Sequence, residues 1–420
     1  MKKSVAAGAA LTMALFILVS PPRARAQSTA RGGWRAEPFK LKSPGGDFEI
    51  ALAGYAQEDF RSYRDWTLVD ADTSELRRLR IGVEGKWKRL SFEVDVDPRK
   101  ERPEDTTEGA HYLKNAYLEL RFAKAFRIRA GHFKLPFSSE YLTSASKTDF
   151  IERAMIVDAI GVDRDWGGVA LGELGPFSYE AGVFQGDGWR SHPRAGTMGA
   201  ARLIVSALTG LDLAVSYNEG RVEAEDETPL VPEPKGFNAK GPAGFTFSSR
   251  HFVNGRRRRL GADGEFQRGP VGFRGEIARG WEERKGQGST FDDLPQAVLT
   301  GWVVSGTWLV TGDKKRRTIR PRSPMLHGPG AVEIGVRYEE VRMDDDGPET
   351  GFAGAGNRAR NIRLAADRAL TGGISWWPRQ WMRLMGNVVL ERFEDELLAP
   401  EPGRRGNYTT LLGRLQISLP

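Results

Sequence analysis

The feature that most constrains this chain is a two-residue alternation of apolar and polar side chains that recurs along most of its length. In residues 90–97 the even-numbered positions carry Leu, Phe, Val and Val, and the odd-numbered positions carry Ser, Glu, Asp and Asp. This period is typical of a strand whose two faces meet different surroundings, whereas a helix would need a period near 3.6. We therefore expect an all-β fold.

Sixteen such segments can be placed, and the connections between them tend to be alternately short and long. The predicted strands lie near 48–57, 77–87, 90–97, 113–122, 126–133, 166–173, 177–184, 198–206, 211–218, 259–267, 271–281, 297–310, 331–341, 369–377, 381–391 and 408–419. Short turns at one end and long loops at the other are typical of outer-membrane barrels. The sequence predicts a 16-stranded antiparallel transmembrane β-barrel over residues 48–420, with short periplasmic turns and long extracellular loops. Strand parity makes residues 311–330 a long periplasmic exception.

The first 26 residues have the pattern of an export signal. Two lysines precede an apolar run from Val5 to Val19, and Ala24-Arg25-Ala26 fits a cleavage site. The run has 15 residues, fewer than the roughly 20 that a spanning helix needs. We expect cleavage before Gln27, which leaves residues 27–47 as an N-terminal periplasmic segment ahead of the barrel.

The composition excludes several kinds of function. The chain has no cysteine, which rules out disulfides, thiolate metal sites and cysteine catalysis. The five histidines have no metal-ligand spacing, and no phosphate-binding loop or dinucleotide fingerprint occurs. Without the export signal, 58 basic and 55 acidic residues remain, and a net charge of +3 is no argument for nucleic-acid binding. We expect no enzyme, no cofactor and no metal site.

Four segments resemble the phosphate-selective porin O/P family. The most specific is Arg129–Phe137, which reads RAGHFKLPF and is followed by LTS at 142–144 and FIERA at 150–154. The others read GWVVSGTWLVTGD at 301–313, VEIGVRY at 332–338 and GGISWWP at 372–378. The resemblance implies a homotrimeric porin in a Gram-negative outer membrane that passes small anions, in some members phosphate or polyphosphate. The chain departs from the usual aromatic barrel terminus by ending in Leu419-Pro420.

An anion channel needs cations on the lumen face of its strands, and arginine suits phosphate because its planar fork can bond two oxygens. The two-residue period assigns the following cations to the lumen: Arg78, Arg80, Lys86, Arg121, Arg127, Arg129, Arg202, Arg274, Arg337, Arg383 and Arg414. Arg78 with Arg80, and Arg127 with Arg129, lie two residues apart on one face, so each pair could form rungs about 7 Å apart along its strand.

Residues 134–165 form the third long loop, which we expect to fold inward and narrow the pore. The loop carries four basic and six acidic residues, so its net charge is −2. The candidate anion-binding residues are Arg78, Arg80, Lys86, Arg127, Arg129, Lys134, Arg153, Arg190, Arg194 and Arg202. Acidic residues lie on the same lumen face. The lumen arginines could therefore form structural ion pairs with them instead of binding anions, and the protein would then be a weakly selective general porin.

Two basic runs lie outside the predicted strands or at their ends. Arg256–Arg259 ends a long loop, where it could capture anions, touch the phosphates of lipopolysaccharide or be simply solvated. Lys314–Arg317 lies on the expected periplasmic side, where it could concentrate anions, touch a binding protein or be a solvated turn. Two other classes remain open: a secreted β-rich binding protein or enzyme, and a barrel with a plugged lumen.

Overall fold

The structure is a computed structural model, and it describes most of the expected barrel. The described residues are 35–37, 39–64, 72–99, 112–186, 197–222, 236–288, 292–347, 362, 364–404 and 406–419. The predicted export signal and the candidate residues Arg190 and Arg194 lie outside them. In this described part, no helix is both long enough and apolar enough to cross a membrane.

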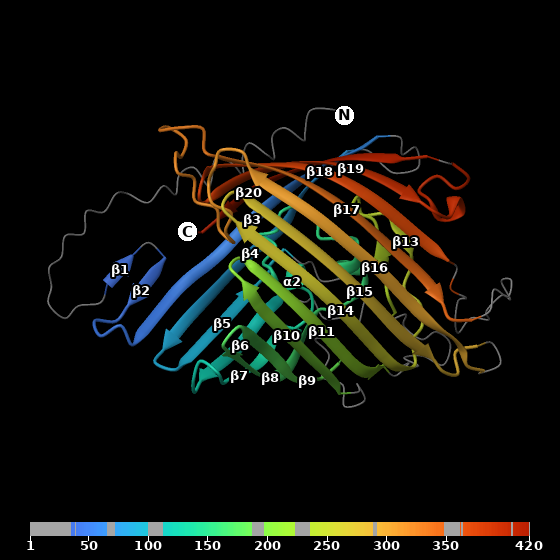
Figure 1. Cartoon of the computed structure of the whole chain (residues 1–420), viewed down its shortest axis with the longest axis horizontal. Coiled ribbons are helices and arrows are strands. Elements are labelled where there is room, and N and C mark those ends of the chain that lie inside the picture. The colour runs from blue at the N-terminus through green and yellow to red at the C-terminus, as the bar shows by residue number, and fades with distance from the viewer. Residues whose placement is uncertain are drawn as a thin grey trace.

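Sixteen strands of the described chain form one closed antiparallel barrel (Figure 1). They are β3 (Phe48–Arg64), β4 (Thr73–Trp87), β5 (Leu90–Val96), β6 (Leu113–Arg121), β7 (Arg127–Lys134), β8 (Arg164–Leu174), β9 (Phe177–Phe184), β10 (Met198–Leu208), β11 (Leu211–Val222), β14 (Gly255–Arg268), β15 (Val271–Arg284), β16 (Leu294–Leu309), β17 (Ala331–Asp345), β18 (Ala365–Arg379), β19 (Met382–Phe393) and β20 (Tyr408–Ser418). Each pairs with the next of these strands, and β20 closes the ring on β3 through a register that runs from Thr409↔Arg64 to Ser418↔Tyr55. The predicted 16-stranded barrel is confirmed.

The barrel wall buries charge and exposes apolar side chains. On β17 the inward-facing Glu333, Arg337 and Glu339 are each at most 2% exposed. On the same strand the outward-facing Ile334 and Val336 are 42% and 54% exposed. A soluble sheet protein has the opposite arrangement, because exposed apolar surface in water costs free energy. Hydrocarbon removes that cost, so this outer surface suits the interior of a bilayer.

A short hairpin precedes the barrel. Its strands are β1 (Arg35–Glu37) and β2 (Lys40–Lys42), and β2 pairs with the first residues of β3. Because β20 pairs with β3 only from Tyr55 onward, the backbone groups of the earlier residues of β3 need other partners on that side. The hairpin satisfies those groups at Glu49–Ala51.

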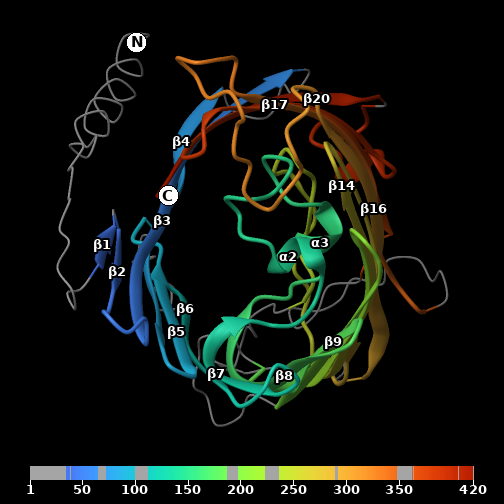
Figure 2. The ribbon, with the colours of Figure 1, turned by 60° about the vertical axis from the view of Figure 1, so that its left-hand side comes forward.

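Two long loops fold into the barrel. The first runs from β7 to β8 and contains α2 (Ser139–Leu142) and α3 (Met155–Ala159), which lie inside the ring of strands in Figure 2. The second joins β11 to β14, and its described part, residues 236–254, contains the small sheet of β12 (Ala239–Lys240) and β13 (Thr246–Ser248). A 3-10 helix, η1 (Glu396–Leu398), lies in the connection from β19 to β20.

Glycines in the wall make room for the apolar side chains of the first loop. A Cβ atom on Gly261 of β14 would lie 2.9 Å from the Phe137 ring, and one on Gly373 of β18 would lie 3.2 Å from the Phe150 ring. Both distances are tighter than ordinary carbon contacts. The many glycines of this chain therefore do more than form turns, because some let the inward loop approach the barrel wall.

Candidate functional site: the barrel lumen

The inward loop 135–163 is held by arginines of the barrel wall. Arg337 donates to the carbonyl of Glu152 at 2.8 Å. Arg383 donates to the carbonyl of Thr148 at 2.7 Å. Arg414 donates to the carbonyl of Ile151 at 2.6 Å, and its other nitrogens bind Asp59 at 2.6 and 2.7 Å. The sequence places these arginines in the lumen, and the structure shows that they hold the loop in position there.

Polar groups of the wall also accept hydrogen bonds from the loop. The Glu276 carboxylate accepts from the Ser138 hydroxyl at 2.5 Å and from the Glu140 amide at 2.8 Å. The Asn387 side chain accepts from the Ile151 amide at 2.9 Å. Since buried backbone groups need such partners, the loop has one well-defined position in the lumen.

Glu152 of the inward loop lies among several arginines of the wall. Its carboxylate lies 2.6 Å from Arg61 and 3.6 Å from Arg77. Burial alone would raise the pKa of Glu152, but Arg77, Arg78, Arg414 and Arg61 outweigh it and lower the pKa to about 2. The negative net charge of the loop is thus partly neutralised by the wall.

Glu152→Gln is expected to reduce the acid sensitivity of the fold. The pKa of Glu152 lies below the ordinary 4.5, so the charged form stabilises the protein above about pH 4.5, and this contribution is lost as the pH falls toward 2. The variant should be less stable by a few kcal/mol at neutral pH and change less between pH 5 and 2. Urea unfolding in detergent at several pH values measures both effects. Glu394→Gln, at an exposed outward position, is the control, and a variant curve as steep as that of the wild type would contradict the prediction.

Residues 311–330 lie at the short-turn end of the barrel and fold back to its lumen. The amide of Lys315 donates to the carbonyl of Gly269 in the turn between β14 and β15, and the amide of Met325 donates to the carbonyl of Pro378 near the end of β18. The Lys315 ammonium lies 2.5 Å from both Asp149 of the inward loop and Glu333 of β17. This segment therefore joins the wall to the inward loop at one end of the pore.

Between these elements lies a lumen cavity of about 1330 Å³. It is lined by fourteen lysines and arginines and seven aspartates and glutamates, an excess of seven formal positive charges. The cations come from the wall, the two inward loops, the N-terminal hairpin and residues 311–330. Six of them have no ion pair or side-chain hydrogen bond within the described chain: Lys147, Lys240, Arg250, Arg316, Arg317 and Arg320.

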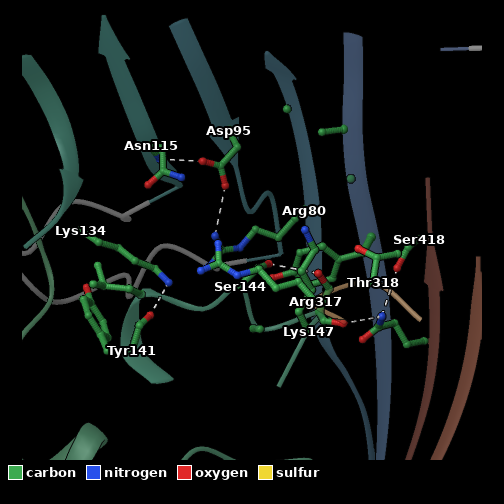
Figure 3. A pocket seen from close by; sticks show the side chains of 18 of the residues that line it. Arg80, Asp95, Asn115, Lys134, Tyr141, Ser144, Lys147, Arg317, Thr318 and Ser418 are labelled. Atoms are coloured by element: carbon green, nitrogen blue, oxygen red, sulfur yellow. Dashed lines mark hydrogen bonds and ion pairs between the residues drawn. The ribbon is translucent and has the colours of Figure 1, made fainter. Parts of the chain in front are cut away.

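Three of the candidate residues from the sequence line this cavity. Arg80 binds Asp95 at 3.1 Å, and Asp95 also accepts from the Asn115 amide at 2.8 Å (Figure 3). Lys134 donates to the carbonyls of Tyr141 and Thr143. Arg153 donates to the Thr143 carbonyl at 2.8 Å. All three cations therefore face the cavity and are also bonded to its wall.

The remaining described candidates lie elsewhere. Arg78 donates to Gln57 at 3.1 Å, and the exposed Lys86 does not line the cavity. Arg127 and Arg129 share Glu119, at 3.3 and 2.7 Å. Arg202 forms a buried bidentate pair with Asp263 at 2.5 and 2.7 Å, again outside the cavity.

The candidate list from the sequence omits several cavity cations, among them Arg77 and three arginines of residues 311–330. Arg77 reaches the cavity because a β-bulge between Leu76 and Arg78 breaks the two-residue period, and no sequence signal marks that bulge. Arg316, Arg317 and Arg320 belong to the basic segment that the sequence assigns to the short-turn side, where it could concentrate anions, and the structure places these three residues in the lining of the lumen cavity. The sequence signal for these residues is the high density of basic side chains in a long segment that interrupts the pattern of short turns.

A closed barrel with an apolar exterior, a charged lumen and inward-folded loops defines an outer-membrane porin. The chain belongs to the phosphate-selective porin O and P family, whose sequence profile matches residues 50–223 and 250–418. The family resemblance seen in the sequence is confirmed. Family and fold together indicate a channel of the Gram-negative outer membrane rather than an enzyme.

Several solved structures share this fold at low sequence identity. OmpT of Vibrio cholerae, an outer membrane protein, is 10% identical over 89% of this chain and 98% of its own, with a TM-score of 0.57. The anion-selective porin from Comamonas acidovorans is 12% identical over 89% and 100%, with a TM-score of 0.55. The outer membrane channel DcaP of Acinetobacter baumannii is 12% identical over 90% and 99%, with a TM-score of 0.54. A comparison with curated protein sequences found no match.

Proposed function

We propose that this porin passes small anions, with phosphate-like anions preferred, by passive diffusion through the lumen cavity. The observation that carries the proposal is the excess of seven formal positive charges around that cavity. A charged lumen with low-dielectric walls concentrates ions of the opposite sign, so no chemical step is needed. The solved anion-selective porin with the same fold agrees with the proposal.

The cations around the cavity suit conduction better than tight binding. Arg80 is bound to Asp95, and Lys134 and Arg153 are bound to carbonyls, so each has part of its donor capacity already in use. An ion meeting such groups is attracted but can leave, as conduction requires. We propose these three residues as the anion path, together with the six cavity cations that have no side-chain partner within the described ranges. Arg190 and Arg194 remain sequence-based candidates.

A weakly selective general porin is the second candidate. It is favoured by the pairing of Arg127 and Arg129 with Glu119, and of Arg202 with Asp263, which leaves these arginines little free charge. In that case the lumen arginines would serve the barrel structure, and solute size would decide passage.

The assembly and export of this chain are also proposals. Membership of this porin family supports a homotrimer. The N-terminal sequence pattern supports removal of residues 1–26 during export. Crosslinking and heat-modifiable migration of the detergent-extracted protein would report trimers, and the mass of the mature chain would report the cleavage.

The test of the proposed function is the reversal potential of the purified porin in a planar bilayer under a KCl gradient. Anion selectivity predicts a reversal potential on the chloride side, and a phosphate preference predicts that added phosphate blocks the chloride current. A potential near zero with no effect of phosphate would favour the general porin. A folded trimer that conducts no ions would contradict both.

A further inference from the structure

The four consecutive arginines at 256–259 are divided between the two faces of β14. Arg257 faces the lumen, where its Nε atom lies 2.5 Å from Glu282, and Arg259 is also directed inward and is 3% exposed. Arg256 and Arg258 face outward, and the side chain of Arg256 is 52% exposed. The outward pair is not part of the pore, because its side chains face away from the lumen. It lies at the long-loop end of the strand.

The neighbouring strands add two more outward arginines at the same height. Arg221 of β11 is paired in register with Arg256, and Arg279 of β15 is paired with Leu260, two residues from Arg258. Directly opposite residues of an antiparallel pair lie about 5 Å apart. We call these four residues, Arg221, Arg256, Arg258 and Arg279, the arginine patch.

Acidic neighbours neutralise only part of the arginine patch. Glu219 lies 3.5 Å from Arg256, while Glu283 binds Lys285 and the Arg256 amide. The other three arginines form no ion pair among the residues that the structure describes, although Glu219 lies opposite Arg258 in the strand register. Arg258 and Arg279 lie over the Trp281 ring, at 5.7 and 5.2 Å from its centre.

Two outward arginines of the nearby strands β17 and β18, which only β16 separates from β15, are instead paired with carboxylates. There the outward Arg342 lies 3.1 Å from Glu394, and Arg368 lies 3.1 Å from Glu340. These arginines are at the same long-loop end of β17 and β18 but are paired with carboxylates. Within the described residues, the arginine patch therefore has fewer close carboxylates than these two neighbouring arginines.

An apolar groove of about 560 Å³ lies on the same strands, toward the middle of the bilayer. Small residues, Ala262, Gly264 and Gly275, lie among its lining, and Leu213 and Trp302 lie beside them. Ala262 and Gly264 follow Arg258 by four and six residues on β14, which corresponds to about 13 and 20 Å along the strand. Cationic groups and an apolar groove thus follow each other along one outward face.

We propose that the arginine patch and the groove bind one molecule of lipopolysaccharide, a phosphorylated glycolipid of the outer leaflet. The unpaired guanidinium groups would bind its phosphates, and the groove would take an acyl chain. Guanidinium forks bind phosphate oxygens in pairs, and Trp281 has the side chain that is typical of the membrane interface. The site lies outside the pore, so it is separate from the proposed anion path.

The test compares one triple variant and one double variant of the folded porin in detergent. Arg221→Ser/Arg258→Ser/Arg279→Ser is expected to weaken binding of purified lipopolysaccharide at least tenfold, measured as co-migration on native gels or by native mass spectrometry. The matched control, Arg342→Ser/Arg368→Ser, should bind as the wild type does. Equal binding by the triple variant would overturn the proposal, as would loss of the trimer, which would assign this face to a subunit interface.

Further arms separate the lipid from its phosphate. Gly275→Leu should fill the groove without a clash, because the nearest atom to its Cβ would be 3.7 Å away. It should weaken binding of lipopolysaccharide but not of the deacylated form. If millimolar inorganic phosphate displaced all of the bound lipopolysaccharide, the patch would be a site for free phosphate, and the proposal of a glycolipid site would be overturned. Because the patch lies outside the pore, the triple variant should keep the wild-type reversal potential in bilayers without lipopolysaccharide, whatever the solute of the pore.

Discussion

Arg414→Met is expected to lower the free energy of unfolding by about 3–5 kcal/mol and to loosen the inward loop. Arg414 and Asp59 form a bidentate pair whose side chains are 0% and 1% exposed. Removing the arginine leaves a buried carboxylate without its cation and frees the carbonyl of Ile151. Urea unfolding in detergent should show the lost stability, and single-channel recordings should show a larger or noisier conductance.

Two further variants separate stability from loop position. Arg368→Met removes an exposed outward pair with Glu340 and should cost no more than about 1 kcal/mol. Asp59→Leu combined with Arg414→Met removes both charges and should recover most of the stability while the conductance stays altered. An Arg414→Met protein with wild-type stability and conductance would show that this arginine does not hold the loop.

Arg316→Gln/Arg317→Gln/Arg320→Gln is expected to reduce anion selectivity strongly. The change lowers the formal excess around the cavity from seven positive charges to four. Three charges about 8 Å from an ion in water contribute about 1.5 kcal/mol, roughly a tenfold change in local anion concentration at low salt. The reversal potential in a KCl gradient should move toward the potassium side, and the shift should shrink as the salt concentration rises.

The matched control for this variant is Arg127→Gln/Arg129→Gln. These two arginines face the lumen but lie outside the cavity and share the carboxylate of Glu119. Their removal should leave the reversal potential almost unchanged. If this control shifts the potential more than the triple variant does, the anion path runs along β7, and residues 311–330 do not select ions.

The family segments and the turn pattern were enough to predict the barrel, because the two-residue period and the turn residues act locally. The same period correctly assigned Arg337, Arg383 and Arg414 to the lumen face. It could not show that these side chains bind loop carbonyls more than 150 positions away in the chain. Such contacts depend on where the loop lies, which no local pattern encodes.

The candidate site was predicted less completely than the fold. Arg80, Lys134 and Arg153 line the cavity, whereas Arg202 is occupied by Asp263 of another strand. In the sequence, Arg80 and Arg202 are alike, because both are arginines on the lumen face of a strand. Both meet an aspartate of another strand, but the Arg202–Asp263 side chains are 4% and 6% exposed and those of Arg80 and Asp95 are 16% and 14% exposed. That burial depends on which residues the register and the inward loops bring around each pair.

The sequence by itself determined the number of strands, the face of each regular strand position and the side of the membrane expected for residues 311–330. Only the tertiary structure decided which cations keep free charge, that Lys315 ties residues 311–330 to the inward loop, and that the side chains of Arg256–Arg259 are divided between the inner and outer faces of the wall. Alternation is a property of neighbouring residues along one strand. Charge neutralisation is a property of residues brought together by closure of the barrel.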